Sequence, residues 1–476
     1  MSIWYSIATH IASTHVIHIA TLLKEDYMRT VLLVCLVLLV ALPLTAQVNI
    51  KYEKYKLKNG LTVILHEDHS VPIVGVNIWY YVGSGREEKR KSGFAHLFEH
   101  MMFQGSENIS KEDQIKSIED VGGNFNGSTN TDRTNYWEIV PSNYVETALW
   151  LESDRMGFLL EGLTLDKLDN QRDVVKNERR QNYENQPYGL ASKLISENMY
   201  PPHHPYHWLT IGTQEDLTAA SVQDVKNFFT RYYGPSNAGL SIAGNFKTSE
   251  MKKLVEKWFD DIPAGRPVER LKPIPFEFSG VKELVMEDRV QLPRLYLSWH
   301  SSPSFSKDDA ALQLLANILG QGKSSRLYRS LVYEKQIAQD VVSFQGSREI
   351  AGTFSIVATA KPGFTLTDLK KAIDEEVAKI KSALVRSREL ERVKNGYKSS
   401  AIYRIQNVGG FGGKSDLLNS YEYYTGDPGF LAKDLDRFMK VSAQDIQRVA
   451  QTYLDMNAMV VLSVVPQGKT ELKATF

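Results

Sequence analysis

The chain has 476 residues, more than one small core needs, and its length predicts two or three domains. Lysine plus arginine and aspartate plus glutamate both number 56, so the formal net charge is zero and no global field recruits nucleic acid or an anionic membrane. Apolar residues make up 42% and charged residues 24%, as in a soluble globular protein. We therefore expect no nucleic-acid partner.

The N-terminal segment has the pattern of an export signal. An apolar stretch runs from Val31 to Leu44, follows Lys24 and Arg29, and precedes small residues. It is shorter than the roughly 20 apolar residues that span a bilayer, although an uncleaved anchor is the alternative. Residues 1–46 are predicted to be a signal peptide or leader, with Met28 as a second possible start. The mature chain is then secreted or periplasmic and keeps no stable membrane span.

The single cysteine, Cys35, lies inside this leader. Without it the mature chain has no thiol. This excludes a disulfide framework, a cysteine nucleophile and a thiolate metal site.

The first half of the mature chain alternates strands and helices. Residues 61–83 are dense in β-branched and aromatic residues and predict strands, and the Gly/Asn-rich run at 122–140 predicts a turn followed by strands. Helical periodicity predicts helices around 95–103, 111–121, 145–160 and 165–185.

The second half repeats this pattern. Residues 281–309 resemble 61–88, and a predicted helix at 311–322 follows, where the first half has 95–105. A proline-rich stretch separates the two copies and predicts a linker. The predicted domains are 47–262 and 281–476, joined by the linker 263–280. The fold class is α+β, with two homologous mixed-sheet domains.

His96-Leu97-Phe98-Glu99-His100 is the motif that carries chemistry. Four residues apart on a helix, His96 and His100 project from one face, and two neutral imidazoles there can bind zinc. Glu99 points toward the same face, where it can accept a proton from a water acidified by the metal. The alternative interpretation is structural: His96 and His100 would be core residues without a metal, and Glu99 would be exposed to solvent. The motif alone lacks a third ligand.

The second copy lacks this motif. Matching the Gln-Gly pairs at 104–105 and 321–322 places Gln313, Ala316 and Asn317 at the motif positions. None of these side chains replaces an imidazole pair and a carboxylate.

Three runs carry a family resemblance: SGFAHLFEHMMFQGSEN, GGNFNGSTNTDRTNYW and VVKNERRQNYENQPYG. They closely resemble the pitrilysin or insulinase-like (M16) zinc metallopeptidases, most nearly the bacterial members of processing-peptidase size. The resemblance continues through 211–246 and 319–335 and covers nearly all of the mature chain. It implies a duplicated LuxS/MPP-like metallohydrolase fold and one Zn2+ ion.

Carried over by motif, the resemblance makes His96 and His100 metal ligands and Glu99 the catalytic base. The third ligand of the family lies in a V-V-x-x-E segment, which ends here at Glu178. Glu184 is a weaker candidate, and a solvated helix face is the alternative for Glu178.

The resemblance also implies an edge strand that pairs with the substrate backbone. Asn126, Gly127 and Ser128 match that strand, although a simple hairpin turn is the alternative interpretation.

Two departures from the family pattern stand out. Gln171 occupies a position where many relatives carry a supporting glutamate, and Val332 and Gln339 stand where active relatives often carry an Arg and a Tyr that help stabilise the oxyanion. We therefore expect a second M16 subunit, in a heterodimer or a homodimer, to complete the site.

The resulting prediction is a zinc metalloendopeptidase that cleaves unfolded peptides. The alternatives are a largely non-catalytic zinc-binding assembly subunit and a specific leader-processing peptidase. A serine hydrolase is disfavoured because no G-x-S-x-G elbow occurs. His203, His204 and His207 form a proline-flanked cluster that we interpret as structural rather than metal-binding.

Overall fold

The computed structural model describes residues 49–475. The predicted leader at 1–46 lies outside these residues and stays a prediction. Within the described part, none of the helices has the length and apolar character needed to cross a membrane.

The first half forms a six-stranded sheet in the order β1-β2-β6-β3-β5-β4. Only β2 and β6 pair in parallel; the other neighbours are antiparallel. The strands are β1 (Glu53–Lys56), β2 (Thr62–Glu67), β3 (Ile73–Tyr80), β4 (Asn124–Thr129), β5 (Thr134–Pro141) and β6 (Ala238–Gly244). β3 and β6 are almost wholly buried, which their mainly apolar sequences favour.

The helices of this half, apart from α6, pack with the sheet around one apolar core. The helices are α2 (Phe94–Met101), α3 (Lys111–Glu119), α4 (Val145–Phe158), α5 (Leu165–Arg179), α6 (Ala191–Met199), α7 (Gln214–Ala219), α8 (Val222–Tyr232) and α9 (Thr248–Phe259). Short helical turns are η1 (Ser84–Arg86), η2 (Ser142–Tyr144), η3 (Arg180–Glu184) and η4 (Pro235–Asn237). The predicted helices at 95–103, 111–121, 145–160 and 165–185 are confirmed, the last as α5 continued by the π-helical turn η3.

The second half repeats the topology in a five-stranded sheet, β7-β11-β8-β10-β9. Replacing β2, β3, β4, β5 and β6 by β7, β8, β9, β10 and β11 reproduces the strand order, including one parallel pair at the same place. The strands are β7 (Gly280–Asp288), β8 (Arg294–Ser301), β9 (Ala338–Ser347), β10 (Gly352–Ala360) and β11 (Ala458–Pro466). The duplicated α+β fold is confirmed.

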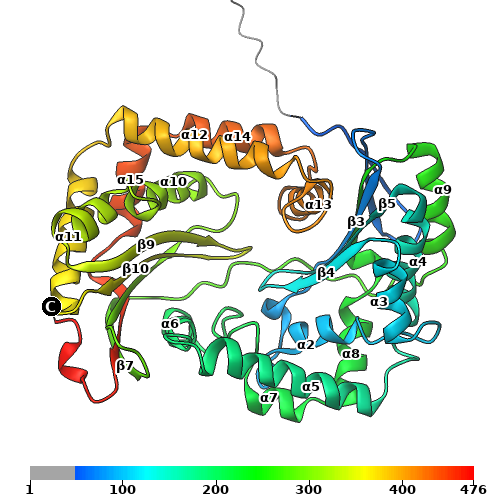
Figure 1. Cartoon of the computed structure of the whole chain (residues 1–476), viewed down its shortest axis with the longest axis horizontal. Coiled ribbons are helices and arrows are strands. Elements are labelled where there is room, and N and C mark those ends of the chain that lie inside the picture. Colours follow the sequence, from blue (N-terminus) through cyan, green and yellow to red (C-terminus); the bar gives the residue numbers. More distant parts are fainter. Residues whose placement is uncertain (1–48, 476) are drawn as a thin grey trace, which may run out of the picture. The chain divides into compact units, whose positions relative to one another are not determined.

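A separate apolar core lies between this sheet and its helices. Figure 1 shows α10 beside β9 and β10, with α11 and α15 close by. The helices are α10 (Asp309–Gly320), α11 (Leu366–Ser382), α12 (Ser387–Arg404), α13 (Lys414–Thr425), α14 (Leu431–Lys440) and α15 (Ala443–Tyr453), with η5 (Tyr328–Glu334) and η6 (Thr470–Leu472). No regular helix or strand occupies residues 263–279, where the linker is predicted; the exact domain boundaries stay a prediction.

One helix of each half packs against the sheet of the other half. α13 packs on β3 and β6, where Trp79 Nε1 donates to Asp416 at 2.8 Å. α6 packs on β11 and β8, with Ala191 buried against Leu462. The loop before α13 approaches β3 so closely that a Cβ on Gly75 would lie 2.8 Å from the Gly409 Cα.

Candidate metal centre

The helix α2 presents His96, Glu99 and His100 on one side. Its buried residues include Leu97 and Phe98, which fix the opposite side in the core. The two imidazole rings stand 4.8 Å apart and nearly perpendicular, at 82°. The local periodicity of the helix alone creates this arrangement.

A buried carboxyl group holds the start of α2. Glu87 accepts hydrogen bonds from the backbone N–H of Gly93 at 3.0 Å and of Ala95 at 2.8 Å, where the first helical amides lack partners. Gly93 itself lies at φ 86°, which favours glycine. Nothing in the motif spacing marks Glu87, and sequence reasoning missed it.

The helix α5 brings Glu178 to the same place. Glu178 Oε2 lies 3.4 Å from His100 Nε2 and 3.7 Å from His96 Nε2. In the described part of the chain these three residues are the one group of metal-ligating side chains, with ligand atoms within 4.8 Å of one another. Glu184 lies elsewhere, paired with Arg179 at 3.0 Å.

The donor set suits a zinc ion. Ligand atoms about 2.1 Å from a tetrahedral ion lie about 3.4 Å from one another, close to the two separations from Glu178. Burial, and then the proximity of His100, lowers the pKa of His96 to about 4, so its imidazole is neutral and keeps a lone pair for a metal. The hydrogen bond with His100 lowers the pKa of Glu178, which stays a carboxylate.

Glu99 is held by the end of β4. Thr129 Oγ1 donates to Glu99 Oε2 at 2.5 Å. Burial raises the pKa of Glu99, while the Thr129 hydrogen bond and the nearby Arg133 oppose that rise. A raised pKa makes the Glu99 carboxylate a better proton acceptor, which is the property that a general base needs. The Thr129 contact was missed because it joins residues on separate elements.

The strand β4 forms one edge of the first sheet. Asn126, Gly127 and Ser128 lie within it, paired with Trp137, Tyr136 and Asn135, so the hairpin-turn interpretation is wrong for these three residues. Asn126 is exposed, and its Oδ1 accepts from Gly127 N at 2.7 Å.

Ser128 is engaged within the hairpin. Its hydroxyl and its carbonyl both accept from Arg133 Nη1, at 2.6 and 2.7 Å. Of the three predicted substrate residues, Asn126 therefore has the side chain most open to a peptide.

The remaining predicted positions do not belong to the metal-ligating group. Gln171 is buried on α5 and donates to Asn170 at 2.8 Å. Val332 packs partly buried against the second core, and Gln339 is exposed on β9.

The histidine-rich loop has the contacts of a structural element. His204 is buried, its ring stacks on Tyr200 at 4.5 Å, and its Nδ1 accepts from Tyr206 N at 3.1 Å. His207 Nδ1 bonds the Tyr200 carbonyl at 2.7 Å.

Two family models match the chain. "Insulinase (Peptidase family M16)" matches residues 62–205, and "Peptidase M16 inactive domain" matches residues 219–397. The chain belongs to the M16 peptidase family. The "inactive domain" match includes α10, which carries Gln313, Ala316 and Asn317 at the motif positions. It begins upstream of the predicted linker.

Curated M16 relatives are zinc proteases by name. Zinc protease PqqE of Helicobacter pylori is 29% identical over 411 residues, covering 85% of this chain and 90% of the relative. The uncharacterized zinc protease YmxG of Bacillus subtilis is 28% identical, covering 77% and 88%. A protease structure from Helicobacter pylori superposes with a TM-score of 0.80 at 28% identity, covering 88% of this chain and all of that one. These names support zinc and the peptidase class.

Proposed function

We propose that this M16 family member is a zinc metalloendopeptidase that hydrolyses peptide bonds of unfolded peptides. One zinc ion is held by His96, His100 and Glu178. The observation that carries the proposal is the convergence of these three side chains, from two helices, beside Glu99. The convergence lies within the half that the insulinase model matches.

When bound, zinc supplies positive charge that polarises the scissile carbonyl and acidifies the attacking water. Glu99 accepts the proton of that water and passes it to the leaving amine. Thr129 fixes the orientation of the carboxylate through its hydrogen bond, so the base is preorganised.

The free edge of β4 supports an extended peptide as the substrate. A peptide that adds a strand there gains main-chain hydrogen bonds without strong sequence preference. Asn126 is exposed on that strand and contacts the peptide. A folded protein offers no extended segment for this pairing, so unfolded peptides are preferred.

A second M16 subunit, another chain or a second copy of this one, completes the site. The Arg and Tyr of active relatives are replaced by Val332 and Gln339, and Val332 packs against the core of its own half. The oxyanion at the scissile carbonyl therefore needs donors from elsewhere. We place the protein in the periplasm or outside the cell, in line with its predicted leader.

The deciding experiment measures hydrolysis of a quenched peptide library by zinc-loaded chain 47–476, alone and mixed with candidate M16 partners. We expect hydrolysis that chelator abolishes and that Glu99→Gln reduces about 10³-fold. The Glu99→Gln variant keeps one zinc per chain, because Glu99 is not a ligand. Tight zinc binding without hydrolysis in any mixture would instead establish the non-catalytic assembly subunit.

The same assay separates the leader-processing alternative. A general endopeptidase cleaves short unrelated peptides, whereas a processing enzyme cuts long precursors once and leaves the short peptides intact. Full activity of this chain as a monomer, with its monomeric state measured under the assay conditions, would contradict the partner requirement.

A further inference from the structure

Asp132 is a buried carboxylate in the turn between β4 and β5, with an exposed fraction of 2%. Its oxygens accept three hydrogen bonds from three distant segments. Tyr206 Oη donates to Oδ1 at 2.9 Å, while Glu349 N at 2.9 Å and Tyr424 Oη at 2.7 Å donate to Oδ2. Two of these donors, Glu349 and Tyr424, belong to the second half. A turn residue that only closed a hairpin would need none of them.

The turn that carries Asp132 leads directly to the proposed base. Asn130 N donates to Arg133 O at 3.0 Å, and Asn130 Oδ1 accepts from Asp132 N at 2.8 Å. These bonds make the turn a compact unit, and Thr129 precedes it in the chain. A displacement of Asp132 therefore moves Thr129, whose hydroxyl holds Glu99.

The first half supplies the other anchor of the turn. Ser84 N donates to Asn130 O at 3.0 Å, and Gly85 N donates to Thr131 O at 2.8 Å. These bonds hold one side of the turn, and Asp132 holds the other. The position of Thr129 thus depends on both halves.

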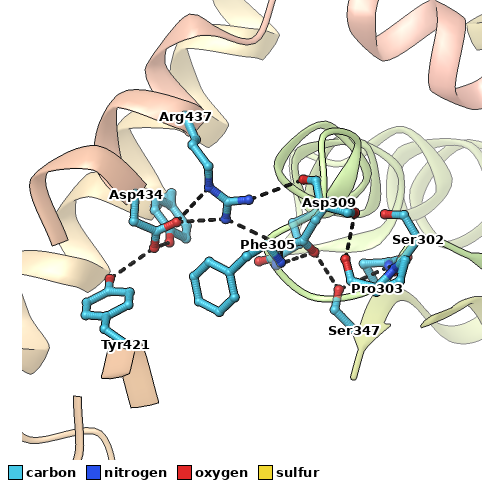
Figure 2. A network of polar contacts seen from close by, with 12 residues as sticks. Ser302, Pro303, Phe305, Asp309, Ser347, Tyr421, Asp434 and Arg437 are labelled. Carbon is cyan, nitrogen blue, oxygen red and sulfur yellow. Dashed lines mark hydrogen bonds and ion pairs between the residues drawn. The ribbon is translucent and has the colours of Figure 1, made fainter. Parts of the chain in front are cut away.

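The donors from the second half are themselves braced by the network in Figure 2. Ser347 Oγ, two residues before Glu349, donates to Asp309 Oδ1 at 2.5 Å. Arg437 links Asp309 at 3.4 Å with Asp434 at 2.7 Å.

The same network reaches α13. Tyr421 on this helix donates to Asp434 at 3.1 Å, and Tyr424 packs against Phe305 with ring centroids 5.5 Å apart. Phe305 lies under Arg437, 5.0 Å from its guanidinium. The β9–β10 hairpin and α13, which supply the two donors, are thereby tied to the same buried ion pairs.

We infer that Asp132 is a positioning residue through which the half without metal ligands sets the place of Thr129 and the orientation of Glu99. This inference rests on the proposed peptidase function. It gives the second half a part in the reaction although none of its residues replaces a metal ligand.

The test compares Asp132→Asn and Tyr424→Phe with a matched control, Tyr453→Phe. Asp132→Asn replaces an acceptor oxygen by an amide that faces donors. Tyr424→Phe removes one donor and keeps the ring. Tyr453 donates to Asp308 at 3.0 Å and belongs to no part of this network, so Tyr453→Phe removes a similar bond elsewhere.

We expect kcat for a quenched peptide to fall about tenfold in Asp132→Asn and severalfold in Tyr424→Phe, with KM within twofold and one zinc per chain retained. Tyr453→Phe keeps the wild-type kcat. Unchanged kcat in both folded variants, or loss of zinc together with activity, overturns the inference. If Asp132→Asn does not fold, Tyr424→Phe carries the comparison.

Amide hydrogen exchange gives a readout that does not require activity. Asp132→Asn and Tyr424→Phe are expected to speed exchange across residues 126–134 about tenfold, and Tyr453→Phe is not. If the wild-type chain hydrolyses no peptide, the proposed function is wrong. The hydrogen-exchange rates of the variants then test the positioning role of Asp132 without an activity assay. Unchanged exchange in that segment overturns it.

Discussion

Glu178 Oε2 lies 3.4 Å from His100 Nε2, although the two residues belong to separate helices, α5 and α2. Val175, buried one turn earlier on α5, fixes the rotation of that helix against the core. Glu184, beyond the end of α5, pairs with Arg179 instead. The choice between the two glutamates as third ligand is therefore open to direct test.

Replacing Glu178 by glutamine should weaken zinc binding. The amide keeps the size of the carboxylate but loses its charge, so we expect zinc affinity to fall by about 10²-fold or more. Glu184→Gln is the matched control and should change affinity less than about twofold. Zinc affinity is measured by competition with a chromophoric chelator. Equal losses in the two variants would contradict the assignment of Glu178.

Asn126 should influence substrate binding more than catalysis. Asn126→Ala removes an exposed amide from the free edge of β4, and we expect KM for unfolded peptides to rise severalfold with kcat nearly unchanged. Asn124→Ala changes an exposed asparagine at the start of the same strand and serves as the control. Steady-state kinetics separate the two constants. A fall in kcat at constant KM would place Asn126 in the chemical step instead.

The sequence alone predicts those features that depend on local periodicity. The pairing of His96 with His100 follows from helix geometry, and the repeat of 61–88 in 281–309 anticipates two sheets with one topology. Glu178 could be assigned to the two histidines only through the family resemblance, because the spacing of residues within α5 does not show which helix Glu178 faces.

Contacts between distant segments could not be predicted. Asp132 bonds Glu349 and Tyr424 across 217 and 292 residues of chain. The sequence of α13 mixes polar and apolar residues among its buried positions, so periodicity does not show that this helix lies on the sheet of the other half. Thr129 and Arg133 were missed for the same reason.

His300 should make the protein less stable in mild acid. Its ring lies edge-on to Tyr200, Phe276 and Phe278, at 4.7 to 5.1 Å, and burial lowers its pKa from 6.5 to about 4. Between pH 6.5 and about 4, the imidazole of His300 is protonated in the unfolded chain and neutral in the folded chain. Stability is therefore present above pH 6.5 and is lost as the pH falls toward 4.

His300→Phe keeps the aromatic packing and removes the titration. From pH 6.5 to 5, we expect the free energy of unfolding of the wild type to fall about 1.5 kcal/mol more than that of the variant. Urea unfolding at each pH measures the difference. Parallel pH profiles would show that His300 is protonated equally in both states.

Arg155 lies in the first core between two buried carboxyl groups. Its Nη2 is 3.1 Å from Glu138 and 3.5 Å from Glu152, and its guanidinium lies over the Tyr136 ring at 4.9 Å. Burial, and then the proximity of Glu152, raises the pKa of Glu138 well above its usual range. One carboxyl group of the pair therefore keeps its proton, and the remaining carboxylate balances Arg155.

This charge balance predicts unequal costs for two substitutions. Arg155→Met leaves a buried carboxylate without its cation and should lower the free energy of unfolding by about 3–5 kcal/mol. Glu152→Gln leaves one carboxylate facing Arg155 and should cost only about 1 kcal/mol. Urea unfolding of both variants at pH 7 provides the comparison. Equal destabilisation would contradict this charge balance, because it would show that Glu152 is needed as much as Arg155 itself.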